Sequence, residues 1–181
     1  MSFRITPDMV INGKIDHIDI GDVKHVDCYE CADLIELPNW PNVEIVECDN
    51  CPQLRELPNW PNVAHVYCNS CPQLRELPNW PNVLTVYCIA CTQLRELPNW
   101  PKVIRVDCDD CTMLEELPNW PNVSRVSFNR CILLRKFPNW QILERTHTSG
   151  CPGLVYAALV VLIQTEFLLD DLKKECILWH V

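Results

Sequence analysis

The chain alternates apolar and polar residues in short stretches that return at a fixed interval. The pattern Val-x-Cys occurs at Val46 and Cys48, and the segment Leu-Pro-Asn-Trp-Pro that begins at Leu37 returns at Leu57, Leu77, Leu97 and Leu117. Residues two apart on an extended strand face the same side. Each Val-x-Cys therefore predicts a strand of three or four residues with one buried face.

This fixed interval divides most of the chain into equal units. Six units fill residues 23–142, and a partial seventh covers residues 143–154. A unit this short cannot enclose a core alone, so successive units must stack and pair their strands in one parallel sheet. Two prolines in each return segment remove backbone donors and favour an extended or 3-10 backbone over an α-helix. The sequence predicts a repeat solenoid.

Both ends of such a stack need a cap. In residues 1–22, an Asn12-Gly13 pair between alternating apolar residues predicts a β-hairpin. Residues 155–181 carry apolar side chains near helical spacing, which predicts an α-helical cap over the last coil. The same segment is apolar around much of its circumference, so contact with a second copy is an alternative role for it.

The unit resembles the leucine-rich repeat, whose signature is LxxLxLxxN/CxL. Val43, Val46 and Cys48 stand at the three leucine positions, and Cys51 stands at the Asn/Cys position. The 20-residue length and the LPxxP ending resemble short repeats of secreted bacterial effectors, and such near-identical units are also similar to repeats in large DNA viruses of amoebae. The resemblance implies a parallel sheet on the concave side and an extended convex side.

Composition and charge narrow the choice of partners and of compartment. The net charge is −9, and residues 1–50 alone contribute −8, which weighs against nucleic acid or an anionic membrane as the main partner. Residues 1–11 lack the pattern of a secretory signal, and the longest apolar run, residues 154–163, is too short to span a bilayer. We expect an intracellular protein, a monomer or a homodimer, that does not enter a membrane.

Tryptophan and cysteine recur in register with the units. Six tryptophans at the same position of successive units predict a stacked ladder inside the solenoid. The motif CxxC occurs five times, with a spacing that also fits structural zinc sites. The solenoid period already imposes that spacing, and Phe128 replaces the cysteine of the sixth unit, so we interpret the thiols as core residues near loop carbonyls. No cofactor is predicted, and a metal-loaded thiol array remains an alternative.

The units differ from one another mainly at two outward positions of the strand and at one outward position just after it. These positions form three rows on the concave sheet surface and are the predicted partner-binding residues. The first row is His25, Ile45, His65, Thr85, Arg105 and Arg125; the second is Asp27, Glu47, Tyr67, Tyr87 and Asp107; the third is Tyr29, Asp49, Asn69, Ile89 and Asp109.

Tyr67, Tyr87 and Ile89 form an apolar centre between charged flanks, which is typical of protein interfaces. We therefore expect a non-catalytic module that binds a protein or peptide. No nucleophile with a positioned base and acid can be named, so no enzymatic activity is predicted. Self-assembly through the C-terminal segment, and simple drift of solvent-facing positions, remain alternatives. Nucleic acid bound at the arginines is disfavoured because Asp107 and Asp109 interrupt them.

Overall fold

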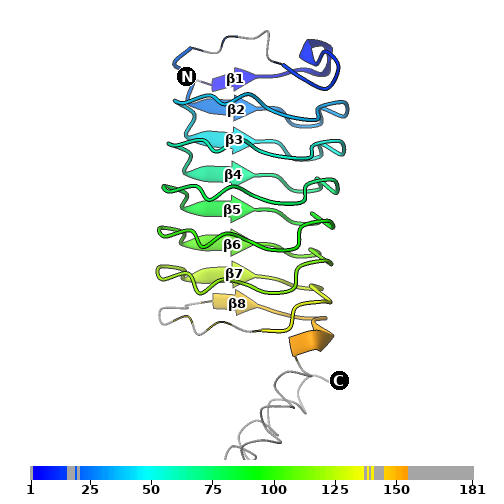
Figure 1. Ribbon diagram of the computed structural model, residues 1–181, viewed down its shortest axis with the longest axis vertical. Helices are drawn as coiled ribbons and strands as arrows, with labels where there is room; N and C mark the ends of the chain where they lie inside the picture. Colours follow the sequence, from blue (N-terminus) through cyan, green and yellow to red (C-terminus); the bar gives the residue numbers. More distant parts are fainter. Residues whose placement is uncertain are drawn as a thin grey trace, which may run out of the picture.

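The computed structural model describes residues 2–15, 19, 21–136, 138, 140 and 145–154, and every statement below concerns these residues. The chain winds as a solenoid of parallel strands, one strand per coil, with the coils stacked along a single axis (Figure 1). The predicted solenoid is thus confirmed. The C-terminal cap predicted for residues 155–181 lies outside the described residues.

The sheet has eight strands that follow one another in chain order and pair in parallel. From β2 onward, partners in adjacent strands stand one repeat apart in the sequence, as in the pairs of Val26 with Val46 and of Val46 with Val66. The strands are β1 (Ser2–Arg4), β2 (His25–Asp27), β3 (Ile45–Glu47), β4 (His65–Tyr67), β5 (Thr85–Tyr87), β6 (Arg105–Asp107), β7 (Arg125–Ser127) and β8 (Arg145–His147).

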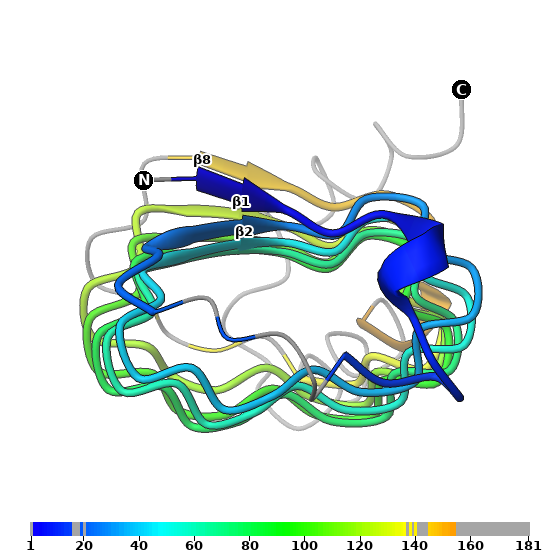
Figure 2. The ribbon, with the colours of Figure 1, turned by 90° about the horizontal axis from the view of Figure 1, so that it is seen from above.

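Each coil is flattened, with its strand along one long side and the proline-rich return segment along the other (Figure 2). Between β2 and β7 the return segments contain turns but no helix, in agreement with the prediction that they are not α-helical. The space between the two sides is filled by the valines, cysteines, leucines and tryptophans of successive units, nearly all fully buried. In the view along the axis in Figure 2, β1 and β8, at the two ends of the sheet, lie further from the return segments than β2 does.

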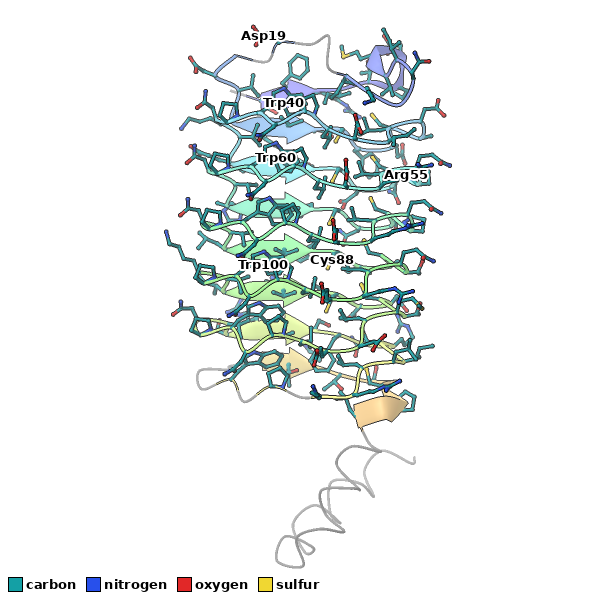
Figure 3. All side chains as sticks on the ribbon, in the orientation of Figure 1. Asp19, Trp40, Arg55, Trp60, Cys88 and Trp100 are labelled. Carbon is teal, nitrogen blue, oxygen red and sulfur yellow. The ribbon has the colours of Figure 1, made fainter. Side chains whose placement is uncertain are left out.

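The tryptophans form the predicted column inside the return segments, where Figure 3 shows Trp40, Trp60 and Trp100 along the axis. From Trp60 to Trp140 the indoles stack with interplanar angles of 4–12° and centroid separations of 5.8–6.4 Å. These separations exceed the strand spacing of about 4.8 Å, so successive coils lie further apart at the tryptophan column than at the sheet. In the same five tryptophans, from Trp60 to Trp140, the Nε1–H donates to a proline carbonyl of the preceding coil, as from Trp80 to Pro58 at 3.0 Å.

The N-terminus contains a strand that the repeat period does not predict. Strand β1 pairs in parallel with β2, and Phe3 lies opposite Val26, an offset longer than the period that relates Val26 to Val46. Ile5 then lies where later coils place a cysteine, because its N–H donates to Asp27 O and its carbonyl accepts from Cys31 Sγ. The alternation of Phe3 and Ile5 is the signal that could have revealed this strand.

The predicted Asn12-Gly13 turn is present. Ile11 and Lys14 form an antiparallel bridge around it, and both turn residues have positive φ, as a tight primed turn requires. A short 3-10 helix, η1 (Pro7–Met9), lies between β1 and this turn. Residues 16–18 and 20, which belong to the predicted hairpin region, lie outside the described residues. The N-terminal segment therefore differs from a simple hairpin by contributing a parallel strand to the sheet.

The turns that follow strands β2 to β8 share one backbone feature, a residue with positive φ at the same position. The residue before the second cysteine has φ between 56° and 61° at Glu30, Asn50, Ser70, Ala90, Asp110 and Arg130, and Gly150 has φ 66° at the same position. Positive φ suits glycine and asparagine but is unfavourable for residues such as alanine. The sequence does not reveal this feature, because most of these residues are not glycine.

Within the described part of the chain, no helix is long and apolar enough to cross a membrane.

Candidate partner-binding face

The three predicted rows lie on one side of the sheet, which we call the sheet face. Strand register aligns the first row from His25 to Arg125 and the second from Asp27 to Ser127. The third row is aligned by backbone hydrogen bonds between successive turns, as from Glu30 N to Asp49 O. All sixteen predicted residues therefore share this face. Tyr29 and Arg125 are exposed, and the other fourteen are half-buried.

The centre of the sheet face is an aromatic stack that ends in an arginine. The rings of Tyr67 and Tyr87 lie 5.1 Å apart and 8° from parallel. The guanidinium carbon of Arg105 lies 4.8 Å from the centroid of the Tyr87 ring, which is a cation–π contact. Burial is the main cause that raises the pKa of the Tyr67 phenol, and the neighbouring Tyr87 and Glu47 raise it further. The sequence analysis placed the two tyrosines and Arg105 on this face, but it did not predict the contact between Arg105 and Tyr87.

The N-terminal part of the sheet face is acidic. Glu47 Oε1 lies 3.0 Å from His25 Nε2, so this carboxylate reaches toward β2. Asp27 faces Arg4, with Oδ2 3.7 Å from Nε, and its Oδ1 accepts the N–H of Tyr29 at 3.0 Å. Asp49 adds a further carboxylate in the third row, and burial raises its pKa. This end of the face can offer carboxylate oxygens to a cationic partner.

Three residues of the third row also hold adjacent coils together. Oδ1 of Asp49 accepts the backbone N–H of Asn69 at 2.6 Å, and Oδ1 of Asn69 accepts that of Ile89 at 2.8 Å. Asp109 Oδ1 does the same for Asn129 at 2.7 Å. Ile89 has no side-chain acceptor and interrupts the series. The predicted binding residues Asp49, Asn69 and Asp109 therefore have a structural role as well, which the sequence analysis did not foresee.

A shallow hollow of about 150 Å³ lies at the C-terminal part of the sheet face. Arg105, Asp107, Arg125, Ser127 and His147 contribute to its wall. Within the described chain, Asp107 Oδ1 is buried without a hydrogen-bond partner. Burial, followed by the charge of Asp109, raises the pKa of the Asp107 carboxyl. The hollow combines both charge signs, unlike the acidic end.

The cysteines line the interior as two columns. The second cysteine of each pair donates its thiol to a backbone carbonyl of the preceding coil, as from Cys71 Sγ to Cys48 O and from Cys91 Sγ to Cys68 O, at 3.1 and 3.0 Å. Hydrogen bonds with neighbouring thiols, followed by burial, raise the pKa of Cys48 and Cys68 well above the ordinary value. The thiols of the second cysteines lie near loop carbonyls, as the sequence predicted. No three potential ligands gather among the described residues in a way that could hold a metal ion.

The return segments expose a second surface, which we call the outer face. It consists of Gln53, Arg55 and Glu56 and their equivalents in the next two coils, all exposed. Figure 3 shows Arg55 projecting away from the core. The glutamates at the equivalent position of the coils just before and just after this face pair with lysines, Glu36 with Lys14 and Glu116 with Lys136. Unlike the sheet face, this surface presents the same side chains in successive coils.

Compared by sequence, the chain matches no protein-family model and no curated protein. The role of the sheet face is therefore inferred from its own geometry and charge.

Proposed function

We propose that the protein is a non-catalytic interaction module that binds a protein or peptide on its sheet face. The observation that carries this proposal is the contrast between the two faces over residues 43–102. Gln53, Arg55 and Glu56 return unchanged in the next two coils, whereas the sheet-face residues of those coils are almost all different. A specific partner needs a surface that does not repeat.

Simple drift of exposed positions does not account for this contrast. The outer-face residues are more exposed than those of the sheet face, and none of them is part of the core. Drift would therefore alter the outer face at least as much as the sheet face, since substitutions at exposed sites cost little stability. The sheet face has diverged between coils despite being half-buried, which favours selection for a binding surface.

The aromatic stack supplies the anchor that such a surface needs. Tyrosine and arginine are enriched among the residues that dominate binding energy at protein interfaces. Tyr67, Tyr87 and Arg105 hold one another in fixed orientations, so little side-chain freedom is left to lose when a partner binds. The acidic end beside the stack adds orientation and faster association.

The test is affinity capture with paired variants of the full chain. Tyr67→Ser/Tyr87→Ser removes the stack, and Arg75→Ser/Arg95→Ser removes two outer-face side chains as the matched control. We expect the stack variant to bind the captured partner at least about tenfold more weakly and the control to bind normally. Urea unfolding of both variants checks that the fold survives. Equal binding by all three proteins would refute the proposal.

The assignment to the leucine-rich repeat class is part of the same proposal. It is supported by the constant register between coils, by the Val-x-Cys strand, and by Cys51 donating inward from the Asn/Cys position to the carbonyl of Cys28 at 3.1 Å. Burial of Ile5 and Ile15 against the first coils supports a capping role for the N-terminal segment. We also propose an intracellular location and a monomer or homodimer. Light scattering over a concentration series tests the oligomeric state.

A further inference from the structure

The aromatic stack has one covered end and one end beside the acidic carboxylates. Tyr87 lies on β5, between Tyr67 on β4 and Arg105 on β6, so both faces of its ring are occupied. The remaining face of the Tyr67 ring looks toward β3. The residue in register with Tyr67 on that strand is Glu47.

The side chain of Glu47 reaches toward His25 on β2, on the side away from the Tyr67 ring. Its Oε1 lies 3.0 Å from Nε2 of His25, which lies on β2, one coil further from Tyr67. Asp49 follows Glu47 in the same coil, and its Oδ1 is engaged by the N–H of Asn69. In the described chain, one oxygen of each carboxylate is thus committed, and the second can accept from a partner.

The chain itself shows which group fits beside a tyrosine of this row. At the opposite end of the stack, the guanidinium of Arg105 lies over the Tyr87 ring. A guanidinium is planar, stacks on aromatic faces and donates several N–H groups to carboxylates, whereas an ammonium is a compact and strongly hydrated charge. The β3-facing side of Tyr67 offers the same kind of ring face and lies beside the carboxylates of Glu47 and Asp49, so it suits a guanidinium that comes from outside.

We propose that the partner inserts an arginine side chain between the Tyr67 ring and the carboxylates of Glu47 and Asp49. This inference rests on the function proposed above and specifies the chemistry of the partner at that surface. The guanidinium stacks on the β3-facing side of the ring and donates to both carboxylates. Net negative charge over residues 1–50 steers an arginine-bearing segment toward this end of the sheet face.

The experiment uses the full chain and three small probes, followed by NMR of the tyrosine ring signals. The probes are the N-acetyl, N-methylamide derivatives of arginine, of lysine and of citrulline, which is the neutral near-isostere of arginine. We expect saturable shifts of the Tyr67 signals with the arginine probe. The citrulline and lysine probes should bind at least about fivefold more weakly, because the first lacks the charge and the second lacks the stacking plane.

Protein variants test the two carboxylates. Glu47→Gln/Asp49→Asn removes both charges, and the asparagine keeps the Oδ1 acceptor for the N–H of Asn69, as Asn69 does for Ile89. The matched control Glu76→Gln/Glu96→Gln makes the same change in net charge on the outer face. We expect the first variant to lose the arginine-induced shifts and the control to keep them.

Three results would overturn the inference: no saturable shift, equal shifts with citrulline or lysine, or unchanged shifts in Glu47→Gln/Asp49→Asn. The comparison of probes uses the unaltered chain, so it does not depend on the folding of any variant. If the arginine probe causes no saturable shift, but Tyr67→Ser/Tyr87→Ser weakens binding of the captured protein partner, this inference alone is refuted. Unchanged capture by that variant would refute the proposed function.

Discussion

Two neighbouring coils show how differently the two sides of the solenoid behave. Residues 51–62 and 71–82 read CPQLRELPNWPN in both coils, whereas residues 43–50 and 63–70 keep only the inward valines and cysteine. The return segment thus repeats its exposed side chains together with its buried ones. The sheet side repeats its buried side chains only. Exposure alone therefore does not set how far the coils differ.

The largest expected effect tests whether the return segment repeats because the interior requires it. Trp80 is fully buried, stacks between Trp60 and Trp100, and donates to Pro58 O. Trp80→Ala should lower the free energy of unfolding by about 3–5 kcal/mol, because it opens a cavity in the middle of the column. Urea unfolding measures this loss. Arg75→Ala, on the same segment but exposed, should change the value by less than about 0.5 kcal/mol; similar losses for both would break the comparison.

The second-largest loss of stability is expected at the turn that joins the sheet side to the return segment. Cys71 is buried and donates its thiol to Cys48 O at 3.1 Å. Cys71→Ala removes both the packing and the donor, so we expect a loss of about 2 kcal/mol in the free energy of unfolding. Cys71→Ser keeps a donor and should lose less. If serine proved as damaging as alanine, the hydrogen bond would have no measurable role.

The turn between the two sides repeats its backbone while its residues change. Ala90 has φ 60°, the left-handed region that costs an L-residue about 1–2 kcal/mol relative to glycine. Ala90→Gly should therefore stabilise the protein by about 1 kcal/mol, which thermal or urea unfolding would record. Thr85→Gly, in strand β5 where φ is extended, is the control and should destabilise. A destabilising Ala90→Gly would contradict the assigned turn.

The smallest expected effect is on the pH dependence of the free energy of unfolding, and it involves the sheet-face residue Asp107. Burial raises the pKa of Asp107 above its ordinary value of 3.8, so the folded state holds this proton more tightly than the unfolded state. The stability contributed by the protonated carboxyl is present at low pH and is lost as pH rises through the folded pKa. Asp107→Asn should gain up to about 0.5 kcal/mol at neutral pH and nothing at about pH 3. A gain that is equal at both pH values would exclude the carboxyl as its source.

The sequence predicts whatever depends on the period alone. Inward columns, parallel register, a return segment without α-helix and the three rows of the sheet face were predicted from the repeating unit, and the structure bears them out. Strand β1 is missed because its offset to β2, from Phe3 to Val26, is longer than the period. The period carries no information about such a change of spacing.

Side-chain geometry within the rows is the other part that the sequence leaves open. The period places Tyr87 and Arg105 in adjacent coils, but the cation–π contact depends on the rotamer of the arginine. The bonds from Asp49 and Asn69 to the following coil likewise depend on local rotamers. Candidate residues can therefore be placed on a face from sequence, whereas their division between structural and binding roles requires coordinates.

The most direct test of the binding face is hydroxyl-radical footprinting of the protein alone and in complex with its captured partner. Tyr67 and Tyr87 report on the sheet face, and Leu84 and Pro78, half-buried elsewhere on the same coils, report on the remaining surface. We predict that oxidation of the two tyrosines falls in the complex while that of Leu84 and Pro78 is unchanged. Protection of the return segment with the tyrosines still fully reactive would contradict the account.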